Sequence, residues 1–199
     1  MMDSKVVKII FKNALQDKGY TFYEKDSFNL NIIGVRMGLK ATNTFDDYLY
    51  IIFKNHSDKW SHREYKITTD AGAYWLENPM NAKGTAILKP NQYKGGWKLG
   101  KHQGKYTALV QKEEVEVYRD NTKDMILDYD ETKVDKGFFG INFHRSNPHT
   151  ESFQVDKWSA GCQVFKKAND FFEFITICKV AEEEWGNSFT YTLLNYNEI

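Results

Sequence analysis

The chain has 199 residues, of which 41% are hydrophobic and 16% aromatic, enough for a sizeable core and too apolar for a disordered chain. Its 27 basic and 27 acidic residues balance, and no basic cluster stands out, which argues against a nucleic-acid partner. The early apolar run is broken by Lys8 and Lys12 and lacks a cleavage site, so it does not resemble a secretory signal. No segment approaches the ~18 apolar residues of a membrane span. We therefore expect a protein that is cytoplasmic as synthesised.

The N-terminal part predicts one helix followed by strands. Apolar residues recur at helical spacing over about residues 4–18, and Gly19 is a natural stop. The pattern then changes to the period of two that is typical of strands. It predicts strands at Asn29–Met37, Tyr48–Lys54, Glu64–Thr69 and Thr85–Leu88.

The C-terminal part continues this pattern and adds a second helix. Tyr106–Gln111 and Glu114–Arg119 alternate in a way that predicts a hairpin, and Phe138–Phe143 predicts a strand leading into His144. A helix is expected over Ala168–Trp185, followed by a closing strand at Ser188–Asn195.

Many short strands with two helices predict a mainly β (α+β) fold, a sandwich or barrel with the helices packed outside. We divide the chain into an N-terminal helix and strand extension, residues 1–45, and a main domain, residues 46–199, which together form one compact unit. Aromatic Tyr93 and Trp97 lie in a glycine-rich segment between the predicted strands. They fit the floor of a ligand groove and the core equally well.

The segment most suggestive of chemistry joins a histidine to a cysteine. His144 follows an apolar run, and Cys162 lies 18 residues later in the turn Ser159-Ala160-Gly161-Cys162. A free cysteine is mostly protonated near neutral pH and is a weak nucleophile until a base or a dipole assists it. A turn that exposes the sulfur beside a histidine supplies the nucleophile and its base.

The spacing resembles that of the L,D-transpeptidase catalytic domain, whose signature is a histidine, about fourteen residues, and Ser/Thr-His-Gly-Cys. Here His144, Ser159, Gly161 and Cys162 match, and the Thr68–Gly72 run fits the upstream layout. The resemblance covers about residues 60–175 and implies a β-rich fold of that type, acting on peptidoglycan stem peptides through a thioester. No cofactor is implied.

The resemblance also implies the role of each matching residue. Cys162 becomes the nucleophile and His144 its base, while the backbone N–H groups of Gly161 and Cys162 become oxyanion donors and Ser159 supports the turn. Two such donors fit the chemistry of acyl transfer, in which negative charge develops on the carbonyl oxygen.

The chain departs from the family at several positions. Ala160 replaces the second histidine, Gln163 and Val164 replace an apolar residue followed by Arg or Asn, and Arg145 stands where a small residue is common. These changes leave transfer and hydrolysis both open. Arg145, Gln163, His102 and Trp158 are candidate substrate contacts, and His102 is otherwise a loop histidine or a partner of His144.

The other cysteine and the acidic residues are explained by ordinary structural roles. Cys162 alone would be a buried inert thiol, as Cys178 is expected to be within its helix. Two cysteines make no disulfide framework, and they and the histidines match no metal pattern. Asp120, Asp124 and Asp128 lack the glycine and glutamate of a calcium loop, so a turn with exposed acids is favoured.

Two further functions stay open beside the acyl-transfer enzyme. One is a non-catalytic module that binds cell-wall peptide or a protein, which Ala160 and Gln163 favour. The other is a cysteine peptidase unrelated to the cell wall. An enzyme without a signal peptide fits a phage or prophage product released by lysis, or another route of export. The oligomeric state is not predicted.

Overall fold

The computed structural model describes residues 2–38 and 43–199. The helices are α1 (Ser4–Asp17), α2 (Ala73–Glu77) and α3 (Ala168–Trp185), with short 3-10 helices η1 (Glu131–Lys133) and η2 (Tyr196–Glu198). The strands are β1 (Asn31–Arg36), β2 (Asp47–Lys54), β3 (Trp60–Thr68), β4 (Thr85–Leu88), β5 (Asn91–His102), β6 (Tyr106–Gln111), β7 (Val115–Asp120), β8 (Val134–Gly137), β9 (Phe143–Arg145), β10 (Gln163–Phe165) and β11 (Phe189–Asn195).

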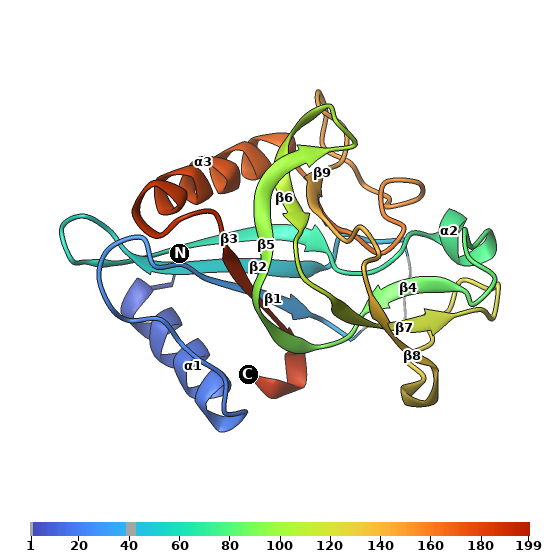
Figure 1. The fold of residues 1–199 in the computed structure, drawn as a ribbon, viewed down its shortest axis with the longest axis horizontal. Helices are drawn as coiled ribbons and strands as arrows, with labels where there is room; N and C mark the ends of the chain where they lie inside the picture. Colours follow the sequence, from blue (N-terminus) through green and yellow to red (C-terminus); the bar gives the residue numbers. More distant parts are fainter. Residues whose placement is uncertain (1, 39–42) are drawn as a thin grey trace.

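Over these residues the fold is mainly β, as the sequence predicts. Eight strands close into a barrel in the order β1-β11-β5-β6-β9-β10-β3-β2, and β4-β7-β8 form a second sheet. Figure 1 shows α1 and α3 on opposite sides of the barrel, with the second sheet and α2 at its far end. A closed barrel leaves no unpaired edge, which suits strands this short.

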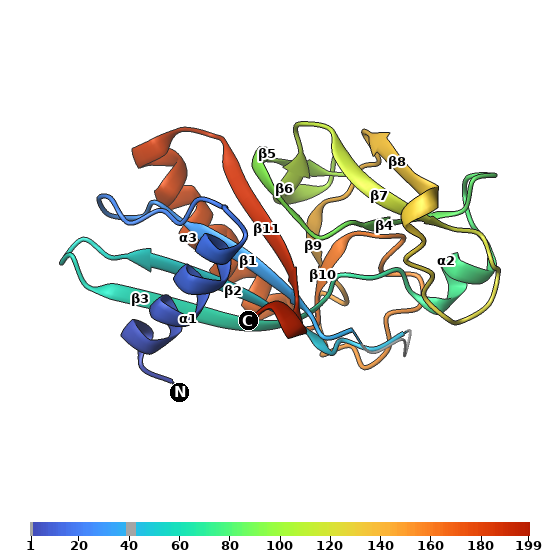
Figure 2. The ribbon, with the colours of Figure 1, turned by 90° about the horizontal axis from the view of Figure 1, so that it is seen from below.

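Helix α1 confirms the prediction for residues 4–18, ending one residue earlier. The Asp3 carboxylate accepts a hydrogen bond from the Lys5 N–H at 2.7 Å and caps the first turn. Its apolar face packs on the outside of β1 and β2, where it covers Ile33, Val35 and Ile52. Figure 2 shows the helix lying across these two strands.

Helix α3 has the predicted bounds and packs against the barrel's aromatic core. Phe171 and Phe174 contact Phe165, with ring centroids 5.5 and 5.1 Å apart. Cys178 is fully buried on the same face, which confirms that it is a core residue.

Strand β1 is an integral part of the barrel. It pairs in parallel with β11 and antiparallel with β2. The N-terminal range 1–45 therefore contributes a barrel strand and is not a separate appendage to residues 46–199. Residues 1 and 39–42 of that range lie outside the described part of the chain.

The predicted hairpin of Tyr106–Gln111 with Glu114–Arg119 is wrong. Both segments are strands, but β6 pairs with β5 and β9, whereas β7 pairs with β4 and β8 in the other sheet. The glycine-rich segment that precedes them forms β5, which the sequence analysis missed. An alternating pattern identifies a strand but does not identify its partner, and glycines hide the pattern altogether.

The strand predicted at Phe138–Phe143 is also displaced. Strand β9 begins only at Phe143, so that His144 lies within the strand and not beyond its end. Gly140 has a φ of +70°, a left-handed conformation that interrupts an extended run. Phe138 is 66% exposed, which removes it from the core that the apolar pattern suggested.

Trp97 and Tyr93 belong to the core, which decides between the two readings of the glycine-rich segment. Trp97 is fully buried inside the barrel and donates its indole N–H to the Ile141 carbonyl at 2.7 Å. Its ring packs edge to face against those of Phe143 and Tyr191, at centroid distances of 5.5 and 5.4 Å.

Within the described ranges, no helix is long and apolar enough to cross a membrane.

We predict that Trp97→Phe lowers the free energy of unfolding by about 2–4 kcal/mol, because it leaves a cavity and an unpaired Ile141 carbonyl. The matched control is Trp158→Phe, at a loop side chain that is 40% exposed. The control should change stability by less than about 0.5 kcal/mol. Denaturant titration measures both, and equal effects would contradict the placement of Trp97 at the centre of the core.

Candidate active site

Strand pairing brings the predicted nucleophile and base to one face of the sheet. Strands β9 and β10 are parallel, with Val164 opposite His144, and the Gln163 N–H extends the ladder to the Asn142 carbonyl at 3.0 Å. Side chains alternate along a strand, so Cys162 and Val164 share the face of His144. Phe143 and Phe165 point the other way, into the barrel core. Cys162 and His144 are therefore diagonal neighbours on the outer face.

The surroundings of His144 fix which ring nitrogen carries the proton. Its Nδ1 lies 2.9 Å from the Arg145 carbonyl oxygen, which only accepts, so Nδ1 is protonated and Nε2 keeps its lone pair. The ring is 5% exposed, and this burial, with nearby His102 and Arg145, lowers the pKa of His144 to about 3. At neutral pH the imidazole is uncharged, and the same burial that keeps it neutral makes its unprotonated Nε2 a weak base.

His102 lies directly over His144 and is itself held in one orientation. The two rings stack with centroids 4.2 Å apart and an interplanar angle of 22°. Asn142 accepts from the Gln111 N–H through Oδ1 at 3.0 Å, which turns its amide nitrogen toward His102 Nδ1 at 3.1 Å. His102, at the end of β5, thus packs on His144, as expected if it orients that ring.

Cys162 is half-buried, and its sulfur lies between two backbone groups. The Asn142 N–H points at Sγ from 3.4 Å, and the thiol donates to the Gly140 carbonyl at 3.5 Å. Burial raises the pKa of the thiol to about 11, although the Asn142 N–H partly offsets this. Within the described residues, no hydrogen bond joins Sγ to His144. The resting pair is a thiol and a neutral imidazole.

Ser159 closes the turn that carries Cys162. Its hydroxyl donates to the Cys162 carbonyl at 2.9 Å and accepts from the Gly161 N–H at 3.1 Å. Gly161 has a φ of +115° and passes close to the Ala86 carbonyl, so a side chain there would clash. The Ser159 carbonyl is held in turn by the Gly72 N–H at 2.9 Å.

The turn leaves only one of the two expected oxyanion donors without an acceptor within the described residues. The Gly161 N–H is already bonded to Ser159, so in this arrangement it is not available to a substrate oxygen. The Cys162 N–H has no acceptor among residues 2–38 and 43–199. A substrate carbonyl would therefore find one free donor in the turn.

Of the other candidate substrate contacts, Arg145 and Trp158 are partly exposed, whereas Gln163 is buried. The Arg145 guanidinium stacks on the Tyr106 ring at 4.5 Å, close to His102, and is partly exposed. Gln163 is different, because it is fully buried inside the barrel and accepts from the Tyr191 hydroxyl at 2.8 Å. It does not face the substrate side of the sheet. Trp158 is 40% exposed in the loop before the turn.

Two residues at the site were missed by sequence reasoning. Asn142 contacts both Cys162 and His102, and the Tyr106 ring stacks with the Arg145 guanidinium. Asn142 lies two positions before His144, and the period of two along a strand places it on the same face. This spacing is visible in the sequence and could have identified Asn142. Nothing local in the sequence brings Tyr106 to this site.

A cavity of about 330 Å³ borders the turn at Ala160. Ala160, where the resembling family has a histidine, lines it together with Trp75, Phe139 and Arg119. Arg119 and Thr85 give this cavity a polar part beside its aromatic lining.

The acidic run after β7 is built as a loop with internal hydrogen bonds. Asp120 is buried, not exposed as expected, and accepts from the Thr122 and Asp128 N–H groups. Both of its oxygens are thus used by the loop that it organises. Over the described part of the chain, no group of three His, Cys, Asp or Glu side chains is arranged to hold a metal ion.

Comparisons with protein-family models, with curated proteins and with solved structures found no match to this chain. The chemistry of the site therefore has to be inferred from the arrangement of Cys162, His144 and their neighbours.

We predict that the two cysteines react very differently with iodoacetamide. Cys162, partly exposed, is alkylated in the native protein, whereas Cys178 reacts only after denaturation. With a thiol pKa of about 11, the rate at Cys162 should rise about tenfold per pH unit from neutral pH up to about pH 10. Peptide mapping by mass spectrometry measures each site. A rate that levels off below about pH 8 would contradict the neutral thiol and imidazole pair.

Proposed function

We propose that the protein is a cysteine-dependent acyl-transfer enzyme of the L,D-transpeptidase type, acting on peptidoglycan stem peptides. The observation that carries the proposal is the β9–β10 register, from which Cys162 and His144 share one face of the sheet, with Nε2 the unprotonated nitrogen of the histidine. The spacing from His144 to Ser159, Gly161 and Cys162 supports the substrate class.

The reaction would proceed in two steps. Sγ attacks the substrate carbonyl carbon and forms a C–S bond, while the thiol proton moves to His144 Nε2. The carbonyl oxygen becomes an oxyanion that faces the Cys162 N–H. The amine of the cleaved bond leaves with the proton from His144, and a thioester remains on Cys162. A second amine, or water, then attacks the thioester and restores the thiol.

The raised pKa of the Cys162 thiol and the lowered pKa of His144 both disfavour proton transfer in the resting site, so a bound substrate would have to change the surroundings of the pair. Sγ now donates to the Gly140 carbonyl, and a bound substrate that displaces this contact would turn the proton toward His144. Catalytic hydrogen bonds are often loose before substrate binds. The buried stack with His102 keeps His144 from turning away in the meantime.

Arg145 is the substrate contact that the geometry supports best. Its guanidinium is partly exposed and lies near both histidines through its stacking on Tyr106. A carboxylate on the stem peptide is a suitable partner, because a planar guanidinium binds a carboxylate with two parallel hydrogen bonds. Trp158 is a second exposed side chain on the approach to the turn.

A non-catalytic peptide-binding module is the second candidate, and one observation favours it. The thiol has a pKa of about 11 and no hydrogen bond joins it to His144 among the described residues. A site that only binds peptide needs neither a thiolate nor proton transfer. In that case Arg145, which lies near His102 through its stacking on Tyr106, would bind the stem peptide.

We predict that Cys162→Ala and His144→Ala each reduce conversion of purified muropeptides by at least about 10³-fold, because the pair acts as a unit. The matched control, Cys178→Ala, removes the buried thiol and should leave the turnover of folded protein unchanged. Mass spectrometry of the products distinguishes trimmed stems from new dimers. Binding of muropeptide without any product, by wild type and Cys162→Ala alike, would favour the binding module.

A further inference from the structure

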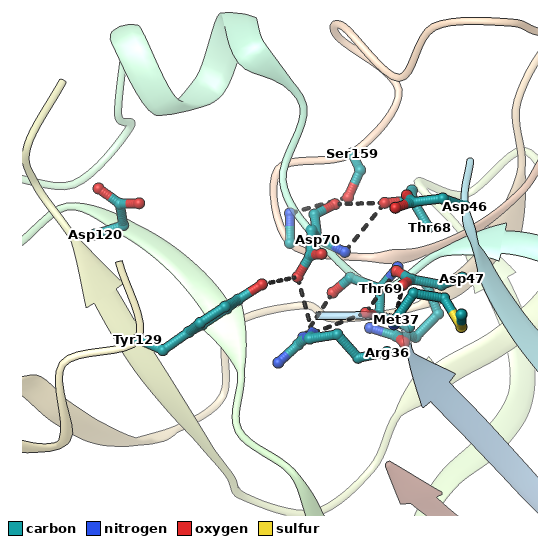
Figure 3. Close-up of polar contacts among 12 residues, drawn as sticks. Arg36, Met37, Asp46, Asp47, Thr68, Thr69, Asp70, Asp120, Tyr129 and Ser159 are labelled. Atoms are coloured by element: carbon teal, nitrogen blue, oxygen red, sulfur yellow. Dashed lines mark hydrogen bonds and ion pairs between the residues drawn. The ribbon is translucent and has the colours of Figure 1, made fainter. Parts of the chain in front are cut away.

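One end of the barrel interior holds a buried charged cluster that the candidate site does not use. Arg36 comes from the end of β1, Asp47 from the start of β2, and Thr69 and Asp70 follow β3. All four side chains are buried, with Arg36 only 2% exposed. Figure 3 shows them gathered around the Arg36 guanidinium, with the Tyr129 hydroxyl pointing at Asp70 and Ser159 nearby.

The hydrogen bonds of the cluster converge on the segment that follows β3. Asp47 accepts from the Thr69 N–H at 2.7 Å and from its hydroxyl at 2.8 Å, both through Oδ2, and from the Met37 N–H at 2.9 Å. Arg36 donates to the Thr69 carbonyl at 3.1 Å and forms an ion pair with Asp70 at 3.0 Å. Thr69 and Asp70 are thus held from both sides.

The same segment holds the nucleophile turn. Two residues after Asp70, the Gly72 N–H donates to the Ser159 carbonyl at 2.9 Å. Gly72 also packs so closely on the backbone of Asp156 that a side chain there would clash. Ser159 in turn bonds Gly161 and Cys162, so the path from Asp47 to the nucleophile is a continuous set of hydrogen bonds and backbone.

We propose that Arg36, Asp47 and Asp70 are positioning residues for Cys162, and that the ionised Asp47 carboxylate is needed to hold the nucleophile turn in place. The inference rests on the proposed role of Cys162. It concerns how the turn is held and not which substrate it meets.

Opposing effects of its neighbours set the pKa of Asp47. Burial and the neighbouring Asp70 raise the pKa of Asp47 to about 7, against the opposing effects of Arg36 and of the Met37 and Thr69 N–H groups. The titratable and charged groups around this pair are Arg36 on β1, Asp46 beside β2, Tyr129 before η1, Tyr191 on β11 and Tyr93 on β5. One guanidinium faces two carboxylates, which leaves a surplus of negative charge when both are ionised.

Protonation of Asp47 has opposite effects on stability and on the turn. The folded state binds this proton more tightly than the unfolded chain does, so the contribution of Asp47 to stability is lost as the pH rises through about 7. A neutral Asp47, however, carries a proton on one oxygen, so it can no longer accept all three hydrogen bonds from the Met37 N–H and the two Thr69 groups at full strength. The turn is therefore held best at the pH where the cluster contributes least to stability.

The test is amide hydrogen exchange of Gly72 and Gly161, followed by NMR from about pH 5.5 to about pH 8.5 and expressed as protection factors. In the wild type, both factors should rise about tenfold as the pH increases through 7, since a buried hydrogen bond is completed. Asp47→Asn should keep the low value throughout. The control, Asp58→Asn, replaces an exposed carboxylate and should follow the wild type.

Wild-type protection and pH profile in folded Asp47→Asn would overturn the proposal. If that variant does not fold, Thr69→Ala removes one of the two groups bound by Oδ2 and should lower the same protection factors by a similar amount. Exchange needs no substrate, so a protein that fails to process muropeptides but shows this pH profile would refute the proposed function and leave the positioning network intact.

Discussion

The parallel pairing of β9 with β10 is the constraint on which the candidate site depends. Each strand has three residues, and their register places Val164 opposite His144. Parallel neighbours require a crossover connection, here residues 146–162, whose last turn carries Cys162. A shift of one residue would turn the cysteine into the barrel and Gln163 outward. The aromatic rings of Phe143 and Phe165, packed against α3, oppose such a shift.

The site is held from two directions, by the apolar core and by buried charge. Gln163, next to the nucleophile, is anchored inside the barrel by the Tyr191 hydroxyl. Ser159, at the start of the turn, is anchored through Gly72 to the segment bound by Asp47 and Arg36. Buried ion pairs contribute little net stability because desolvation opposes them, whereas they restrict the geometry strongly. Such a cluster is better suited to fixing a backbone than to stabilising a fold.

Local patterns in the sequence predict α1, α3 and most strands, because the apolar faces of these two helices repeat at a fixed period, whereas the short helix α2 was not predicted. They do not predict partners. The wrong pairing of β6 with β7, and the missed β5, follow from contacts set by the whole barrel and from glycines that carry no pattern. At the site, the spacing in the sequence predicted the pairing of Cys162 with His144, which the strand register places on one face, and the same period of two could have identified Asn142. The cluster of Arg36, Asp47 and Asp70 joins segments far apart in the sequence, and only the closed barrel brings them together.

We propose that Cys162 forms a covalent acyl intermediate, with His144 as its base. Intact-mass spectrometry of the protein, quenched in acid during incubation with a tetrapeptide stem, tests it most directly. The predicted result is an adduct with the mass of the acyl fragment, mapped to Cys162 and released by hydroxylamine as a thioester should be. Processing of the stem without any adduct on Cys162, or an adduct on another residue, would contradict it.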